Sequence, residues 1–243
     1  EHGMAAVMNG LALYSGLIPY GGTFLIFSDY CKPAIRLSAL MGLRVIYIFS
    51  HDSIGLGEDG PTHQPIEHLM SLRLIPGLDV IRPSNSTEIT HSYNYLFSNT
   101  DSPKALSLTR QNLEYLDYEV DYKDFLYGGF IISEGEDFTI FASGSEVNIA
   151  LELKERFEQY AVRVVSVPIL NKLTPEKSKI FNNNKLAFTI ELGKSIGWSD
   201  YIGNVTESFS IQTFGKSAPM EDLGKFFEIN VDSIAKKIKR YLD

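Results

Sequence analysis

The chain has 243 residues, 44% of them hydrophobic, which is enough to bury a sizeable core in one or two domains. Its formal net charge of -8 argues against nucleic acid or an anionic membrane as a partner, because both select basic surfaces. The single cysteine, Cys31, excludes an internal disulfide, and no apolar run approaches the roughly 18 residues of a membrane span. We therefore expect a cytoplasmic protein whose partners are small molecules or other proteins. The start at Glu1, without an initiator methionine or signal sequence, predicts a piece of a longer protein.

Apolar patterns in the first half predict alternating helices and strands. Small and apolar residues at three-to-four spacing predict a buried helix over 1–15 that ends near Gly16. The predicted series continues with a strand at 24–27, a helix to about 41, a strand at 44–49, a helix at 66–74, a strand at 78–83, a helix through 91 and 95, and a strand at 104–110. This alternation predicts a parallel sheet with helices on its faces.

The second half repeats the pattern after an acid-rich passage at 114–124 that interrupts it. Its predicted elements are strands at 137–145, 162–170, 186–191 and 209–215, and helices at 146–160, at 175–181 and up to 241. We therefore predict an α/β protein of two consecutive domains with mainly parallel sheets, the second domain being the smaller. The expected limits are 1–115 for the first domain, 116–128 for a linker and 129–243 for the second domain.

The stretch 51–65, HDSIGLGEDGPTHQP, contains the pattern G-x-G-x-x-G. A dinucleotide loop joins a strand directly to a helix, whereas here Glu58 and Asp59 would face the phosphates and prolines follow. A metal site on His51 and His63 would lack the short ligand spacing that such sites have. A structural turn stays open as an interpretation, since glycine and proline form turns in any fold. An acid and two histidines at the carboxyl edge of a parallel sheet also suit proton transfer and hydroxyl recognition, so we predict a functional site.

This stretch and the TRQNL around Arg110 resemble the transketolases. The resemblance covers nearly the whole chain and includes EHGM at the start, FLIFSDY at 24–30, and LGKSIGW and FGKSAPMEDLG in the second half. Deoxyxylulose phosphate synthases and ketoacid dehydrogenase β subunits share the architecture, but are not expected to carry GEDGPTHQP. The resemblance implies a pyrimidine-binding domain of the thiamine diphosphate type, truncated at its N-terminus, followed by a transketolase-type C-terminal domain.

The resemblance also implies an activity for the complete enzyme. It would transfer a two-carbon ketol group from a ketose phosphate to an aldose phosphate in the pentose phosphate pathway, with thiamine diphosphate as cofactor, and act as a homodimer. The diphosphate and its Mg or Ca ion are expected on the preceding domain, because the family's G-D-G motif and later asparagine pair have no counterpart here. We therefore expect the isolated chain to be inactive.

Site residues carry over from the family position by position. The resemblance implies that Glu1, in the E-H motif, hydrogen-bonds the cofactor's aminopyrimidine ring and promotes formation of its reactive carbon nucleophile. It implies that Phe24, Phe27 and Tyr30 form the pocket for that ring, as a row at i, i+3 and i+6 can do. Read without the family, these aromatic residues would be core residues.

The substrate channel is implied to contain His51, Asp59, His63 and Arg110. Arg110 offers a bidentate fork for a sugar phosphate, with His51 as a second donor. Asp59 would accept a hydrogen bond from a substrate hydroxyl. His63 would hold a substrate oxygen near the reacting carbons and assist proton movement, so we count it as catalytic as well as substrate-binding.

Two other hypotheses stay open beside transketolase. The chain could be the pyrimidine and C-terminal portion of another thiamine enzyme, or a non-catalytic α/β interaction module. The other histidines on predicted helices, His68 and His91, are expected to be surface or packing residues, and 198–201 to be structural.

Overall fold

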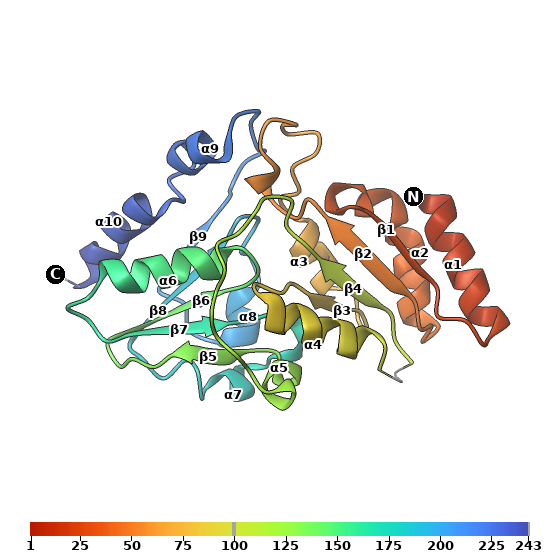
Figure 1. Ribbon diagram of the computed structural model, residues 1–243, viewed down its shortest axis with the longest axis horizontal. Helices are drawn as coiled ribbons and strands as arrows, with labels where there is room; N and C mark the ends of the chain where they lie inside the picture. The colour runs from red at the N-terminus through yellow and green to blue at the C-terminus, as the bar shows by residue number, and fades with distance from the viewer. Residues whose placement is uncertain (99–100, 243) are drawn as a thin grey trace.

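The computed structural model describes residues 1–98 and 101–242. They form two α/β units, each built on its own sheet, with the chain termini far apart (Figure 1). This arrangement confirms the predicted class of two α/β domains with mainly parallel sheets. No helix in the described ranges is long and apolar enough to cross a membrane.

The first unit contains a parallel sheet of four strands in the order β1-β2-β4-β3. Its strands are β1 (Tyr20–Phe24), β2 (Ile46–Ser50), β3 (Asp79–Ile81) and β4 (Lys104–Ser107). Its helices are α1 (His2–Tyr14), α2 (Ser28–Leu40), α3 (His68–Arg73) and α4 (Ser86–Leu96), with short 3₁₀ turns η1 (Leu25–Phe27) and η2 (Ile54–Leu56). In the register of this sheet Phe24 lies opposite Ser50, and Ile81 lies opposite Leu106. The carboxyl ends of the strands therefore meet at one edge.

The second unit contains five strands in the order β5-β7-β6-β8-β9, of which only β5 is antiparallel to its neighbour. Its strands are β5 (Phe130–Ser133), β6 (Phe138–Ala142), β7 (Val162–Ser166), β8 (Leu186–Glu191) and β9 (Glu207–Ser210). Its helices are α5 (Tyr122–Tyr127), α6 (Glu146–Arg156), α7 (Pro175–Ser178), α8 (Trp198–Ile202), α9 (Met220–Phe226) and α10 (Val231–Leu242), with a 3₁₀ turn η3 (Leu170–Lys172).

Several predicted boundaries are wrong. The strand expected at 24–27 ends at Phe24, because the next residues turn as η1 directly into α2. The domain limits stay predictions, and the segment 116–128, expected as a linker, contains the short helix α5, which ends at Gly128 in the left-handed region with φ 106°. The sheet of the second unit includes an antiparallel edge strand, β5, that the sequence pattern did not indicate. The strand expected at 209–215 lies earlier, as β9.

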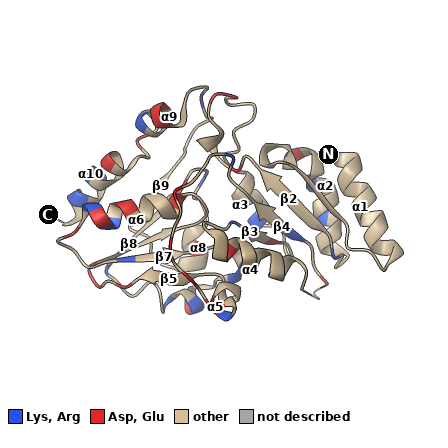
Figure 2. Cartoon of the chain, in the orientation of Figure 1, with Lys and Arg blue, Asp and Glu red and all other residues tan. Residues whose placement is uncertain are grey.

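Charged residues are spread unevenly over the fold. Figure 2 shows Lys, Arg, Asp and Glu on α6, α9 and α10, whereas α1, whose sequence is HGMAAVMNGLALY, has none. Several apolar side chains in and after α1 are exposed, among them Val7 (62%), Leu13 (60%), Tyr14 (85%) and Leu17 (54%). Exposed apolar side chains in such numbers on one segment are typical of a protein contact.

Candidate functional site

The parallel register of the first sheet brings the predicted site residues to one edge. Phe24 is the last residue of β1. His51 directly follows β2, and β2 is the neighbour of β1 in the sheet. Arg110 lies three residues after the end of β4, and β4 pairs with β2 on the side away from β1. Parallel strands end at the same edge of a sheet, and ligands bind beyond that edge in open α/β sheets.

Three aromatic rings form a row at this edge. The rings of Phe24 and Phe27 are nearly parallel, with centroids 6.0 Å apart and planes 19° apart. Those of Phe27 and Tyr30 are also 6.0 Å apart, at 13°. Phe24 and Phe27 are half-buried and Tyr30 is 59% exposed, so the row presents ring surface to a ligand. The 3₁₀ turn η1 followed by α2 gives the spacing of three residues that aligns the rings.

Both histidines of the 51–65 stretch contact this row. The ring of His51 stacks on Phe24, with centroids 3.6 Å and planes 18° apart. The ring of His63 meets Phe27 edge-on at 5.6 Å and 81°. The Thr62 hydroxyl contacts His63 Nδ1 at 2.9 Å, which leaves Nε2 as the ring nitrogen that can bind a ligand.

His51 is held in an unusual backbone conformation with φ 57°, which non-glycine residues adopt rarely. Its Nδ1 contacts the Ser50 hydroxyl at 2.9 Å. Burial lowers the pKa of His51, and the positive charge of Arg110 lowers it further, while Asp59 and Asp52 oppose the shift. His51 is therefore favoured as a neutral imidazole, with both a cation and carboxylates acting on it.

Asp59 and Arg110 have exposed side chains that reach the solvent at this edge. Their charges both act on His51, so the structure places them in its electrostatic neighbourhood. An exposed guanidinium suits a phosphate, and an exposed carboxylate suits hydroxyl groups.

Glu1 contacts both β1 and α2. The Thr23 hydroxyl donates to Glu1 Oε1 at 3.4 Å, and Thr23 precedes Phe24 in β1. The buried thiol of Cys31 donates to the Glu1 carbonyl at 3.4 Å, which ties the start of α1 to α2. Glu1 is exposed in this structure. The structure thus brings the two histidines and the aromatic row into contact, with Asp59 and Arg110 near His51 and with Glu1 beside Thr23.

Sequence reasoning missed four polar residues that support the site. Ser50 and Thr62 orient the two histidines, as described above. Arg82 and Asp52 are both buried and paired, and they hold the start of the 51–65 stretch. Arg82 follows the predicted strand in the run LDVIRP, so its place at the carboxyl end of a parallel strand was a usable signal.

The other interpretations of the 51–65 stretch lose support. No helix begins directly after β2, because η2 and turns occupy the chain until α3 starts at His68, so the geometry of a dinucleotide loop is absent from this described stretch. Among the described residues, no three His, Cys, Asp or Glu side chains lie close enough to hold a metal ion. The stretch does form turns, with φ above 75° at Gly57 and Gly60, but these turns place Asp59 and His63 at the sheet edge.

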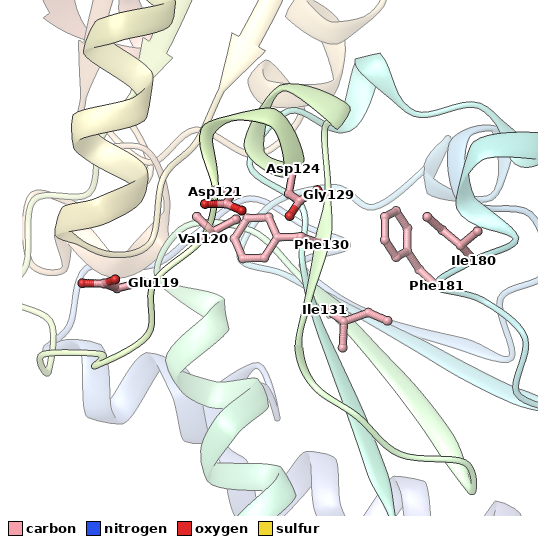
Figure 3. Close-up of a pocket in the computed structure, with 9 residues that line it drawn as sticks. All are labelled: Glu119, Val120, Asp121, Asp124, Gly129, Phe130, Ile131, Ile180 and Phe181. Atoms are coloured by element: carbon pink, nitrogen blue, oxygen red, sulfur yellow. The ribbon is translucent and has the colours of Figure 1, made fainter.

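A cavity of about 510 Å³ lies elsewhere, between the segment before α5 and the second sheet (Figure 3). Its walls carry three acids, Glu119, Asp121 and Asp124, beside the apolar side chains of Phe130 and Phe181. Three carboxylates would repel an anionic ligand. This cavity contains no predicted site residue and is unsuited to a phosphorylated substrate.

Comparison with known proteins agrees with this geometry. Residues 1–115 match the family model for the transketolase pyrimidine binding domain, and residues 128–230 match that for the transketolase-like C-terminal domain. Transketolase from Halalkalibacterium halodurans is 42% identical over 255 aligned residues, which cover 100% of this chain and 38% of the relative. The chain thus spans little more than a third of the length of that curated relative.

Solved structures give the same result. Transketolase from Leishmania mexicana superposes with a TM-score of 0.91 at 36% identity, covering 100% of this chain and 37% of the other. A structure described as a split gene transketolase, inactive beta4 tetramer, has a TM-score of 0.83, and the match covers 99% of this chain and 81% of the other. At 22% identity, this structure shows the shared fold alone. The chain therefore belongs to the transketolase family and corresponds to the C-terminal part of its members, comprising the pyrimidine-binding and C-terminal domains.

Proposed function

We propose that this chain forms part of an enzyme that transfers a two-carbon ketol group from a ketose phosphate to an aldose phosphate. The observation that carries the proposal is the contact between the aromatic row and the histidines, in which His51 stacks on Phe24 and His63 meets Phe27 edge-on. A surface for a flat heterocycle thereby adjoins groups that bind oxygen and move protons. That combination suits a cofactor and a sugar reacting side by side.

The aromatic row fits the pyrimidine ring of thiamine diphosphate. Its rings are nearly parallel and partly exposed, and the Glu1 carboxylate, which contacts Thr23, would supply a hydrogen-bonding group for a ring nitrogen. When bound, the cofactor supplies the carbon nucleophile that takes up the two-carbon unit. Because the chain covers only 38% of a transketolase relative, we propose that the part of the enzyme outside this chain holds the diphosphate and its Mg or Ca ion.

The remaining residues would act on the substrate. Arg110 binds the phosphate through its guanidinium, and neutral His51 supplies a further hydrogen-bond donor beside it. Asp59 accepts a hydrogen bond from a sugar hydroxyl. His63, with Nδ1 engaged by Thr62, uses Nε2 to hold a substrate oxygen and to move a proton there.

We also propose that the complete enzyme is a homodimer that works in the cytoplasm, within the pentose phosphate pathway. The exposed apolar side chains in and after α1 support a protein contact in this region. For the pathway and the compartment, the support for the proposal is the membership of the chain in the transketolase family.

The test is a ketol transfer assay on this chain together with the preceding part of the enzyme, on one polypeptide or as two. We expect transfer that depends on thiamine diphosphate, and no transfer by the 243-residue chain alone. Thiamine-dependent chemistry on a different acyl donor would favour another thiamine enzyme. Failure to bind the cofactor in the complete assembly would favour a non-catalytic module.

A further inference from the structure

The segment 57–64, which carries Asp59 and His63, is attached to the second unit. The Ser217 hydroxyl donates to the Glu58 carbonyl, across 159 positions of the sequence. Gln64 Nε2 donates to the Lys216 carbonyl at 2.9 Å, across 152 positions. Figure 1 shows the orange loop after β2 meeting the blue segment between β9 and α9 at the top of the view.

The side chain of Gln64 makes hydrogen bonds within the 57–64 segment and also to the second unit. It is 1% exposed, and its Nε2 also donates to the Gly57 carbonyl at 2.9 Å and lies 3.4 Å from the Ile54 carbonyl. The backbone N–H of Gln64 donates to the Gly60 carbonyl at 3.1 Å. A single buried side chain therefore closes the loop on itself and fastens it to the segment at 215–218.

The segment at 215–218 is shaped to accept Gln64. A Cβ added at Gly215 would lie 1.7 Å from Gln64 Oε1, so only glycine leaves room for the amide. In the loop itself, Gly60 has φ +79°, and a Cβ at Gly60 would lie 3.1 Å from the Cβ of Ser217. We call Gly215–Ser217 the seat of the loop.

We propose that the seat positions Asp59 and His63 for the substrate, with Gln64 as the positioning residue. Asp59 and His63 lie between the fastened residues Glu58 and Gln64, so their backbone freedom is limited by the second unit. Fixing reacting groups in place before the substrate binds contributes to rate, and a displacement of about 1 Å can cost about 100-fold. This inference rests on the proposed function, and gives the second unit a part in it.

A purely structural role for the seat makes a different prediction. If the seat served only to hold the units together, its loss would lower the unfolding temperature and leave the loop and the substrate kinetics of the folded protein unchanged. If it positions the loop, its loss will loosen 57–63 selectively and raise KM or lower kcat in protein that is still folded.

The experiment compares Gly215→Ala with Gly224→Ala. Gly224 lies in α9 of the same unit, and a Cβ there would meet only Asn230 Cβ at an ordinary 3.6 Å, so it is the matched control. Hydrogen exchange of the peptide 57–63 is measured on the 243-residue chain. Steady-state ketol transfer is measured on the complete enzyme. For Gly215→Ala we expect hydrogen exchange in 57–63 to become at least about tenfold faster. We also expect kcat/KM to fall by about 10- to 100-fold, with neither change in the control.

A second variant covers the case in which Gly215→Ala does not fold. Gln64→Met keeps the length of the side chain and removes its N–H donors without a clash at Gly215, and we expect the same loosening of 57–63. Unchanged exchange and unchanged kcat/KM in the folded variants would overturn the inference. If the unmodified complete enzyme transfers no ketol group, the proposed function fails, whereas exchange on the chain still decides whether the seat holds the loop.

Discussion

Arg82 Nε donates to Asp52 Oδ2 at 2.7 Å, and neither side chain is more than 1% exposed. The same guanidinium donates through Nη1 to Glu146 Oε1 at 2.7 Å and to the Ser143 carbonyl at 2.8 Å. Burial opposes the charge of Arg82, but the two carboxylates outweigh it and raise its pKa. Arg82 therefore connects the first unit, at the residue after His51, to the start of α6 in the second unit.

Loss of this buried cation should destabilise the chain strongly. We expect Arg82→Ala to lower the free energy of unfolding by about 3 to 5 kcal/mol, because it leaves Asp52 and Glu146 buried without their partner. Arg156→Ala is the control, since Arg156 and Asp232 are 61% and 82% exposed and such pairs contribute about 1 kcal/mol or less. Urea unfolding of both variants measures the difference. Equal losses would contradict a special role for the buried pair.

Arg110 should matter for phosphorylated substrates. In the complete enzyme we expect Arg110→Ala to cost about 1.5 to 3 kcal/mol, seen mainly as an increase in KM, because a charge-assisted contact to the phosphate is lost. Unphosphorylated substrates provide the control, since they make no such contact. Steady-state kinetics with both substrate types measure the effect, and a similar loss for both would show that Arg110 does not bind the phosphate.

His63 should affect turnover more than cofactor binding. We expect His63→Ala to lower kcat by about 100-fold, because a group that moves a proton near the reacting carbons is removed. The affinity for thiamine diphosphate should stay near normal in titration calorimetry. Thr62→Val, which keeps the ring but removes its hydroxyl partner, should lose less. Unchanged turnover with weakened cofactor binding would assign His63 to the cofactor instead.

The protonation of His51 should respond to its two charged neighbours in opposite directions. The pKa of His51 is lowered by burial and then by Arg110, while Asp59 raises it. Arg110→Ala removes a positive charge and should raise this pKa, and Asp59→Asn should lower it. NMR titration of the His51 ring in the 243-residue chain measures both shifts.

The lowered pKa of His51 also fixes the sign of its effect on stability. Between the folded and unfolded pKa the unfolded chain binds more protons, so the free energy of unfolding should rise as pH increases through that window. His51→Gln should remove this part of the pH dependence. A pKa that does not move in either charge variant would show that these side chains do not act on His51.

The class of fold and the family can be predicted from the amino-acid sequence alone. Alternating apolar patterns predict helices and parallel strands because burial of one face imposes a period on the chain, and parallel strands bring their carboxyl ends to one edge. The assignment of HDSIGLGEDGPTHQP and TRQNL to one site rests on their resemblance to the transketolases. The structure does bring His51, His63 and the aromatic row together there.

The distant residues that support that edge are visible in the folded protein and not in the sequence pattern. A periodic pattern indicates that a face is buried, but not which segment covers it, so it could not pair Arg82 with Asp52 or Gln64 with the seat. The end of β1 at Phe24 and the antiparallel strand β5 also depend on neighbouring elements. Such contacts arise when the two units pack, because buried polar groups must find partners and the partners lie far away in the sequence.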